Sequence, residues 1–264
     1  MRLRWSVALL VVTMMSSGQA QTPSTTSVTA AGGPIVITAL GHASVQIEYG
    51  GKVVIVDPVT MMADLSKAKP ADLVLVTDIH GDHYDPAAVA KVRKPGAAAV
   101  VPQAVADMKQ IPNPTVMMNA TMRTNEQSLA GITVIAVPAY NIQRGPAPGQ
   151  LFHPRGRGQG YVLAFTDKLA VVRQNMAAQV YVAGDTECVP AMSTWVKDVD
   201  VALMPMNLPY TMTPAEAATC VKEFKPKVAI PYHYMGQKPE EFLDALKGQP
   251  IEVRLLNFYA TGPK

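Results

Sequence analysis

TDIHGDHYD, residues 77–85, is the stretch in which metal-ligand side chains are most concentrated. It follows an apolar run, 72–76, that is typical of a buried strand. It ends at Asp85-Pro86, where a capping aspartate and a proline at the first helical position predict the start of a helix. Carboxylates and imidazoles that alternate in this way cannot all point one way on a regular strand or helix, whereas a turning loop could direct them at one or two cations. With five histidines in 264 residues, the pattern indicates a metal site rather than a chance polar loop.

The first 20 residues have the pattern of a cleavable signal peptide. Arg2 and Arg4 precede a short apolar run, 5–15, and Gly18-Gln19-Ala20 is a small-x-small cleavage site. The run is too short to span a bilayer as a mature helix, and an uncleaved anchor is the alternative. We therefore expect a periplasmic or secreted protein with no stable membrane span after processing.

The rest of the chain predicts one large domain behind a linker. Residues 21–33 are rich in Thr, Ser, Ala and Gly and lack periodicity, which is typical of a flexible linker before a domain over 34–264. Net charge falls from +3 to +1 when Arg2 and Arg4 are removed, and no basic run is present, so no nucleic-acid partner is expected. Cys188 and Cys220 could form a disulfide in an oxidising compartment or remain two buried thiols. The sequence does not indicate the oligomeric state.

Strand and helix signals alternate in two halves. Residues 34–40, 43–49 and 52–56 predict an antiparallel meander with a turn at Gly50-Gly51. Thr213-Pro214-Ala215-Glu216 is a capping box that predicts a helix over 213–224. The pattern indicates an α/β fold: an αββα sandwich of two packed mixed β-sheets with helices on the outer faces. Further strands are predicted at 97–101, 132–137, 161–165, 169–172, 179–183, 199–204, 228–231 and 251–257.

Asp78-x-His80-x-Asp82-His83 resembles the His-x-His-x-Asp-His signature of the metallo-β-lactamase-fold hydrolases, with Asp in place of the first His. The resemblance covers nearly everything from Ile35 to Asn257. It is closest to the branch that contains the lactonase that opens ascorbate-6-phosphate. It implies one or two divalent ions, with Zn²⁺ the first choice and Mn²⁺ or Fe²⁺ as alternatives. Asp78 is either a metal ligand or a supporting residue. As a ligand, its carboxylate would suit manganese or iron; as a supporting residue, it would not bind the metal but would hold a ligand side chain in position.

The same resemblance assigns the remaining metal ligands. Asn141 stands where many members of the family supply a third histidine, and His153, in HPRGRGQGY, is expected to replace it; a plain loop histidine is the alternative. Asp185, after a predicted strand and beside Gly184, is expected to bridge two cations, unless it caps a helix over 187–195. His233 is expected to join Asp82 and His83, unless it only packs between two tyrosines.

Four further positions are candidates for supporting a ligand or contacting the substrate. Asp57 resembles the family's aspartate behind a histidine ligand, or it starts a turn with Pro58. His42 could reach the cavity, or it is a loop histidine bonded to backbone. Tyr210 could point its hydroxyl into the pocket or pack within its loop. Arg144, together with Arg155 and Arg157, could hold an anionic substrate by forked hydrogen bonds or be a solvated charge.

These ligands predict a hydrolase that acts on a small-molecule substrate. Two divalent cations would lower the pKa of a shared water and polarise a carbonyl or phosphoryl oxygen, so that a metal-bound hydroxide attacks an ester, lactone, amide or phosphodiester bond. Asp82 is the candidate catalytic proton shuttle. The chain has no Gly-x-Ser-x-Gly elbow for a serine nucleophile. The alternative is a non-catalytic metal- or ligand-binding periplasmic protein whose first site is degenerate.

Overall fold

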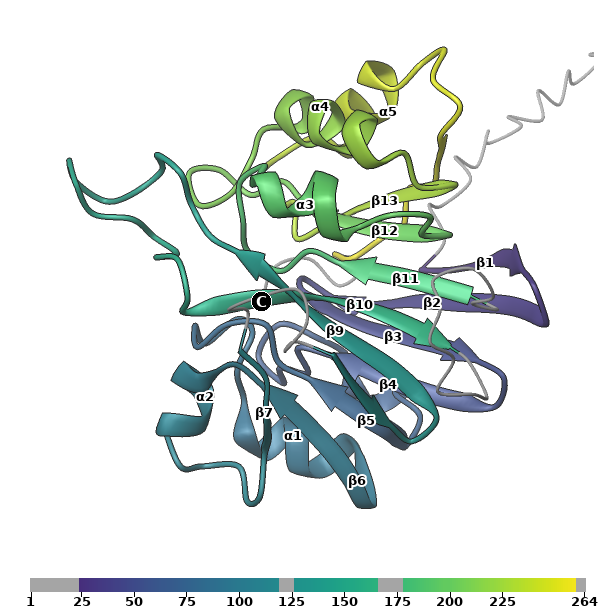
Figure 1. Ribbon diagram of the computed structural model, residues 1–264, viewed down its shortest axis with the longest axis vertical. Coiled ribbons are helices and arrows are strands. Elements are labelled where there is room, and N and C mark those ends of the chain that lie inside the picture. Colours follow the sequence, from purple (N-terminus) through teal and green to yellow (C-terminus); the bar gives the residue numbers. More distant parts are fainter. Residues whose placement is uncertain (1–23, 119–125, 166–177, 260–264) are drawn as a thin grey trace, which may run out of the picture.

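Two β-sheets packed face to face form the centre of the computed structural model, which describes residues 24–118, 126–165 and 178–259 (Figure 1). Within these residues each sheet has seven strands; the first sheet runs in the order β1 to β7 and the second in the order β14 to β8. Helices α1 and α2 cover the outer face of the first sheet, and α3, α4 and α5 cover the second. The predicted αββα sandwich is confirmed.

The first sheet changes direction at its fourth strand. Strands β1 to β4 pair antiparallel, and β4 to β7 pair parallel. The predicted turn between β3 and β4 is present: Tyr49 pairs with Lys52, and Gly50 and Gly51 both have positive φ, which glycine adopts without a steric penalty. The strands are β1 Thr25–Ala30, β2 Gly33–Gly41, β3 Ser44–Tyr49, β4 Lys52–Val56, β5 Ala71–Leu75, β6 Arg93–Val101 and β7 Thr115–Val116.

The second sheet repeats this plan. Strands β8 to β11 pair antiparallel, and β11 to β14 pair parallel. The parallel strands are covered on both faces, which explains their nearly continuous apolar sequences. The strands are β8 Glu126–Leu129, β9 Ile132–Ala139, β10 Gly158–Phe165, β11 Ala178–Val182, β12 Val201–Pro205, β13 Val228–Tyr232 and β14 Glu252–Val253.

The linker predicted over 21–33 was wrong for residues 25–30, which form strand β1. They pair with β2 from Thr25 opposite Thr38 to Ala30 opposite Gly33, and Val28 is buried in the core. The threonines that suggested a linker are also good strand residues, because β-branched side chains suit a pleated surface. The signal peptide predicted at 1–20 and the strand predicted at 169–172 lie outside the described residues.

Local signals predicted the helix starts correctly in two cases. Asp85 caps α1 (Pro86–Val92) by accepting a hydrogen bond from the Ala88 amide, and the capping box of α4 (Pro214–Phe224) is present. The helix expected from residue 187 begins later, as α3 (Pro190–Trp195), with Pro190 in its first turn. The other helices are α2 Gln103–Asp107, α5 Pro239–Ala245 and the short 3-10 helix η1 Leu65–Lys67.

A disulfide ties α3 to α4. Cys188, just before α3, is bonded to Cys220 of α4, and their Cα atoms are 5.5 Å apart. The structure thus selects one of the two states that the sequence left open. In the described residues, no helix is long and apolar enough to cross a membrane.

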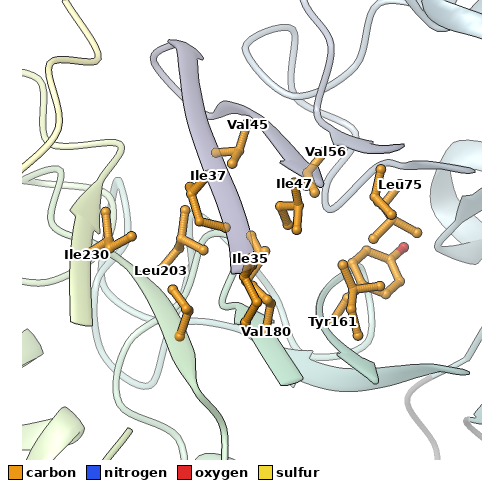
Figure 2. Close-up of a cluster of buried hydrophobic side chains, with 14 of the residues drawn as sticks. Ile35, Ile37, Val45, Ile47, Val56, Leu75, Tyr161, Val180, Leu203 and Ile230 are labelled. Carbon is orange, nitrogen blue, oxygen red and sulfur yellow. The ribbon is translucent and has the colours of Figure 1, made fainter. Parts of the chain in front are cut away.

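The main core lies between the two sheets. Alternate residues of β2 and β3, such as Ile37 and Ile47, point from the first sheet toward Val180 and Leu203 of the second, and all four are fully buried (Figure 2). Tyr161 of β10 adds a polar link between the sheets, because its hydroxyl donates to the carbonyl oxygen of Val76, just after β5. This packing fixes the strand ends from which the functional loops emerge.

Candidate metal centre

The candidate ligands lie on loops that follow the carboxyl ends of strands. Asp57 follows β4, the segment 77–83 follows β5, Asp185 follows β11 and His233 follows β13. His153 comes from the loop that precedes β10. Loops held by rigid strands are where proteins assemble sites, and here the sandwich brings loops from both sheets together.

The described residues contain three groups whose possible ligand atoms lie within 4.8 Å of one another. We call Asp78, His80 and His153 the first site, and His83, Asp185 and His233 the second site. The third group shares His233 with the second site and adds His42 and Asp82. All seven predicted ligands are therefore brought together.

Asp185 lies between the two sites. Its Oδ2 is 3.2 Å from Nε2 of His83 in the second site and 3.1 Å from Nε2 of His153 in the first. Its Oδ1 is 3.6 Å from Nδ1 of His233. Ligand atoms around a tetrahedral zinc ion with bonds of about 2.1 Å are separated by about 3.4 Å, so these spacings suit a shared cation. Asp185 therefore contacts residues of both sites, and its role as a bridge between two cations stays a prediction.

The second site contains buried polar atoms that lack hydrogen-bond partners. They are Nε2 of His83, Oδ1 of Asp185 and Nδ1 of His233. Unpartnered polar atoms are rare in protein interiors, and a cation would satisfy all three at once. The donor set therefore fits a divalent metal ion.

The electrostatics of the second site lead to the same conclusion. Burial opposes protonation of His83, but the carboxylates of Asp185 and Asp57 outweigh burial and raise the pKa of His83 well above its usual value. Burial also opposes ionisation of Asp185, yet His233 and His83 hold the pKa of that carboxyl well below its usual value. Two carboxylates beside one imidazole thus stabilise positive charge, which is what a divalent cation brings.

Asp57 supports His83 from behind. Its Oδ2 is 2.8 Å from Nδ1 of His83, and Thr77 donates to both carboxylate oxygens, from its amide and from its hydroxyl. Nδ1 of His83 therefore donates to Asp57, and Nε2 faces the second site. This is the geometry expected from the resemblance, and burial raises the pKa of Asp57. 

Three residues around the second site have a left-handed backbone. His42, Asp57 and His233 have φ of 48°, 46° and 49°. Non-glycine residues adopt this conformation at an energetic cost, and such strain often gathers where side chains must be aimed. The fold therefore uses strained positions to direct these three side chains.

Asn141 has a role that sequence reasoning missed. Its Oδ1 accepts hydrogen bonds from the backbone N–H of His153, at 2.7 Å, and from its ring Nδ1, at 2.8 Å. Its Nδ2 donates to the carbonyl oxygen of Tyr210, which fixes the orientation of the amide. Nδ1 of His153 therefore carries a proton, and Nε2 faces Oδ2 of Asp185, 3.1 Å away. Asn141 is therefore not placed as a ligand; it orients His153.

The ring of His42 bonds to side chains rather than to backbone, contrary to the alternative considered from the sequence. Its Nε2 is 3.1 Å from Oδ2 of Asp82, its Nδ1 is 2.8 Å from the hydroxyl of Tyr259, and burial lowers its pKa. His233 Nε2 lies 3.2 Å from the same Asp82 oxygen. Tyr259 is a partner that the sequence did not indicate, because it lies 217 residues from His42.

Arg144 stabilises the loop that runs from 142 to 151, and Tyr210 packs beside the end of this loop. Arg144 pairs with Glu187 and Glu216, and Glu187 also accepts hydrogen bonds from the amides of residues 142–144. Arg144 is therefore neither the solvated charge nor the free anion-binding group that the sequence suggested. Tyr210 packs its ring edge-on against Phe152, which is the packed alternative, and its side chain is exposed.

Arg155 and Arg157 have separate environments although only one residue lies between them. The guanidinium of Arg155 lies over the ring of Tyr140, 5.4 Å from its centroid. Arg157 instead reaches the first site, where its Nη2 is 3.1 Å from Nε2 of His80 and its Nε is 3.5 Å from Oδ2 of Asp78. Sequence alone gave no reason to separate the two.

A sandwich of two mixed sheets with clustered histidines and carboxylates at its strand ends defines a metal-dependent hydrolase of the metallo-β-lactamase class. The chain belongs to the β-lactamase superfamily domain family, whose model matches residues 36–233.

Relatives with the same general activity support this assignment. A UPF0173 metal-dependent hydrolase from Thermococcus kodakarensis is 33% identical over 229 residues, which cover 82% of this chain and 94% of that protein. A solved structure from Parabacteroides distasonis, provisionally named a metal-dependent hydrolase, is 36% identical with a TM-score of 0.75, and the match covers 88% of this chain and 99% of that one. Igni18, a metallo hydrolase from Ignicoccus hospitalis, shares the fold at 23% identity with a TM-score of 0.64, over 84% of this chain and 95% of its own.

Proposed function

We propose that the protein is an exported hydrolase that cleaves an ester, lactone or phosphodiester bond in a small-molecule substrate, with zinc, manganese or iron as its metal. The observation that carries the proposal is the second site. There, His83, Asp185 and His233 converge with three buried atoms that lack hydrogen-bond partners. The resemblance to the lactonase branch adds lactones to the substrate classes that merit testing.

Each residue of the site has a defined task in this proposal. His83, Asp185 and His233 would hold the cation, which when bound supplies a Lewis acid and lowers the pKa of a water molecule. Asp57 keeps Nε2 of His83 aimed inward, and Asn141 does the same for His153. Such supporting hydrogen bonds fix the tautomer and orientation of histidine ligands.

Asp82 is the carboxylate of the centre that is most open to a substrate, with 33% of its side chain exposed. Burial opposes its ionisation, but hydrogen bonds with His233 and His42 hold the pKa of Asp82 well below its usual value. It is therefore ionised, and its exposure makes it the candidate for relaying a proton from water to the leaving group.

Export is supported by two separate features. The N-terminal pattern is that of a signal peptide. The Cys188–Cys220 disulfide is the kind of bond that persists in oxidising compartments such as the periplasm. Expression in a bacterium, followed by cell fractionation and mass spectrometry of the N-terminus, would test this part; a cytoplasmic chain that keeps residues 1–20 would contradict it.

The hydrolase proposal is tested by removing and restoring the metal. Chelator-stripped protein should lose turnover of a panel of lactones, esters and phosphodiesters, and Zn²⁺, Mn²⁺ or Fe²⁺ should restore it. Exchanging His83 and His233 together for Ala should lower metal content, measured by elemental analysis. Lys227→Ala is a control, because its ammonium pairs with Asp200 away from the site. Full turnover without metal, or normal metal content in the double variant, would refute the proposal. A chromogenic β-lactam should not be turned over.

A further inference from the structure

The first site already contains a positive charge, which belongs to Arg157. Nη2 of this guanidinium is 3.1 Å from Nε2 of His80 and also donates to the carbonyl oxygen of Phe152. Its Nε lies 3.5 Å from Oδ2 of Asp78. Arg157 therefore contacts two of the three residues of the first site.

Hydrogen-bond directions at His80 leave little room for a metal ion. Arginine only donates hydrogen bonds, so Nε2 of His80 must be the acceptor in this contact. A neutral imidazole that accepts at Nε2 carries its proton on Nδ1, and this nitrogen lies 3.5 Å from Oδ1 of Asp78. One ring nitrogen thus faces a guanidinium, and the other carries a proton. Neither offers a lone pair to a metal.

The unpartnered atoms of the first site also differ from those of the second. In the first site, Oδ2 of Asp78 and Nε of Arg157 are both buried without a hydrogen-bond partner, and they face each other as anion and cation. In the second site, the unpartnered atoms are two imidazole nitrogens and a carboxylate oxygen. A small movement would satisfy the first pair internally, whereas the second set needs an external cation.

Gly158 allows the loop that carries Arg157 to lie close to Asp78. A Cβ on Gly158 would lie 2.5 Å from Oδ2 of Asp78, closer than real atoms approach. The loop that carries Arg157 can therefore lie directly against Asp78 only because residue 158 has no side chain. The aspartate at position 78 also fits a guanidinium neighbour better than a histidine would, because a carboxylate and a guanidinium form charge-assisted hydrogen bonds.

We propose that the guanidinium of Arg157 takes the place of a metal ion in the first site, so that the protein holds a single divalent ion, in the second site. The fixed positive charge of Arg157 then does what a second ion does in two-ion centres: it stabilises negative charge on the substrate. This inference rests on the proposed function only in requiring that the second site bind metal.

Counting ions tests the inference. Full-length protein is stripped with a chelator, exposed to excess ZnCl₂, desalted and analysed for zinc per chain. The unaltered protein should hold one zinc ion, and Arg157→Ala should hold two, a twofold increase, because Asp78, His80 and His153 become free to bind. Arg155→Ala is the matched control and should stay at one, since that arginine stacks on Tyr140. Arg157→Lys keeps the charge and should also stay at one.

A second pair of variants leaves Arg157 untouched. His83→Ala should lose the single ion, and His80→Ala should keep it. Two ions in the unaltered protein, with one lost in His80→Ala, would overturn the inference. So would a count of one in Arg157→Ala and in the size-matched Arg157→Gln when both have normal circular dichroism. Activity measured on the same samples separates the two proposals: two ions with turnover would leave the hydrolase standing, whereas no bound ion in the unaltered protein would remove both.

Discussion

The two halves of the sandwich have the same strand plan but use it differently. In each half, antiparallel strands give way to parallel ones at a central strand, β4 in the first sheet and β11 in the second. A buried aspartate follows each of these strands closely: Asp57 and Asp185. His83 lies between them, with Nδ1 2.8 Å from Asp57 and Nε2 3.2 Å from Asp185.

The difference between the two aspartates lies in their hydrogen bonds. Both carboxylate oxygens of Asp57 accept hydrogen bonds from Thr77. Asp185 has one oxygen without a partner and another that faces two imidazoles. The same place in the fold therefore provides a support for His83 where donors surround the carboxylate, and a candidate metal ligand where they do not.

Removing the ligand aspartate should have the largest effect. Asp185→Ala deletes the carboxylate between the two sites, so metal affinity should fall by more than about 100-fold, beyond the loss typical of supporting residues. Hydrolysis should disappear with the metal. Zinc titration and turnover of the panel measure both quantities, and Asp244→Ala, an exposed acid on α5, is the control. Retained zinc affinity would show that Asp185 is not a ligand.

Changing the support aspartate should have an intermediate effect. Asp57→Asn keeps the size and an acceptor oxygen but removes the charge behind His83, so zinc affinity should fall by about 10- to 100-fold. The same titration measures the loss, with Asp72→Asn, an acid elsewhere in the first sheet, as the control. A loss of zinc affinity as large as that of Asp185→Ala would contradict the distinction between Asp57 as a supporting residue and Asp185 as a ligand.

A smaller effect is expected for the polar link between the sheets. Tyr161 accepts a hydrogen bond from Gln159 and donates one to the carbonyl oxygen of Val76. Tyr161→Phe leaves both groups buried without this partner, so the free energy of unfolding should fall by about 1–3 kcal/mol. Chemical denaturation measures the change, and the exposed Tyr210→Phe should leave stability unaltered. Equal stability of both variants would show that the link between the halves is not energetically important.

The smallest effect is expected for the ion pair between Arg144 and Glu216, which lies in the second half of the sandwich. Partial burial opposes ionisation of Glu216, but the guanidinium of Arg144 outweighs it and lowers the pKa of Glu216 below its usual value. The folded pKa is depressed, so the pair stabilises the protein above the unfolded pKa, near 4.5, and this contribution is lost as pH falls through the folded pKa.

Glu216→Gln isolates this charge, because glutamine can still serve in the capping box of α4. The variant should unfold at a lower temperature than the unaltered protein at pH 6, by the equivalent of a few tenths of a kcal/mol for a partly exposed pair, and the gap should close as pH falls through the folded pKa. Thermal unfolding across this pH range measures it. A gap that persists in acid would contradict the assignment.

Short-range signals predicted parts of the fold well. Asp85-Pro86 set the start of α1, the capping box set the start of α4, and the two glycines set the turn before β4. Caps and turns are decided by atoms within a few residues of one another, so a single sequence contains them. Strand β1 was missed because its stability depends on pairing with β2, and the threonines of a strand resemble those of a linker.

The sequence by itself determined which groups are available: apolar strands, a loop with two carboxylates and two imidazoles, and further ligands after later strands. Only the tertiary structure decided how they are used. Arg144 and Arg157 looked alike in the sequence, yet one pairs with Glu216, 72 residues away, and the other reaches His80, 77 residues away. Hydrogen bonds and charge pairs depend on which atoms the folded chain places within about 3 Å of each other, and no local pattern contains that information.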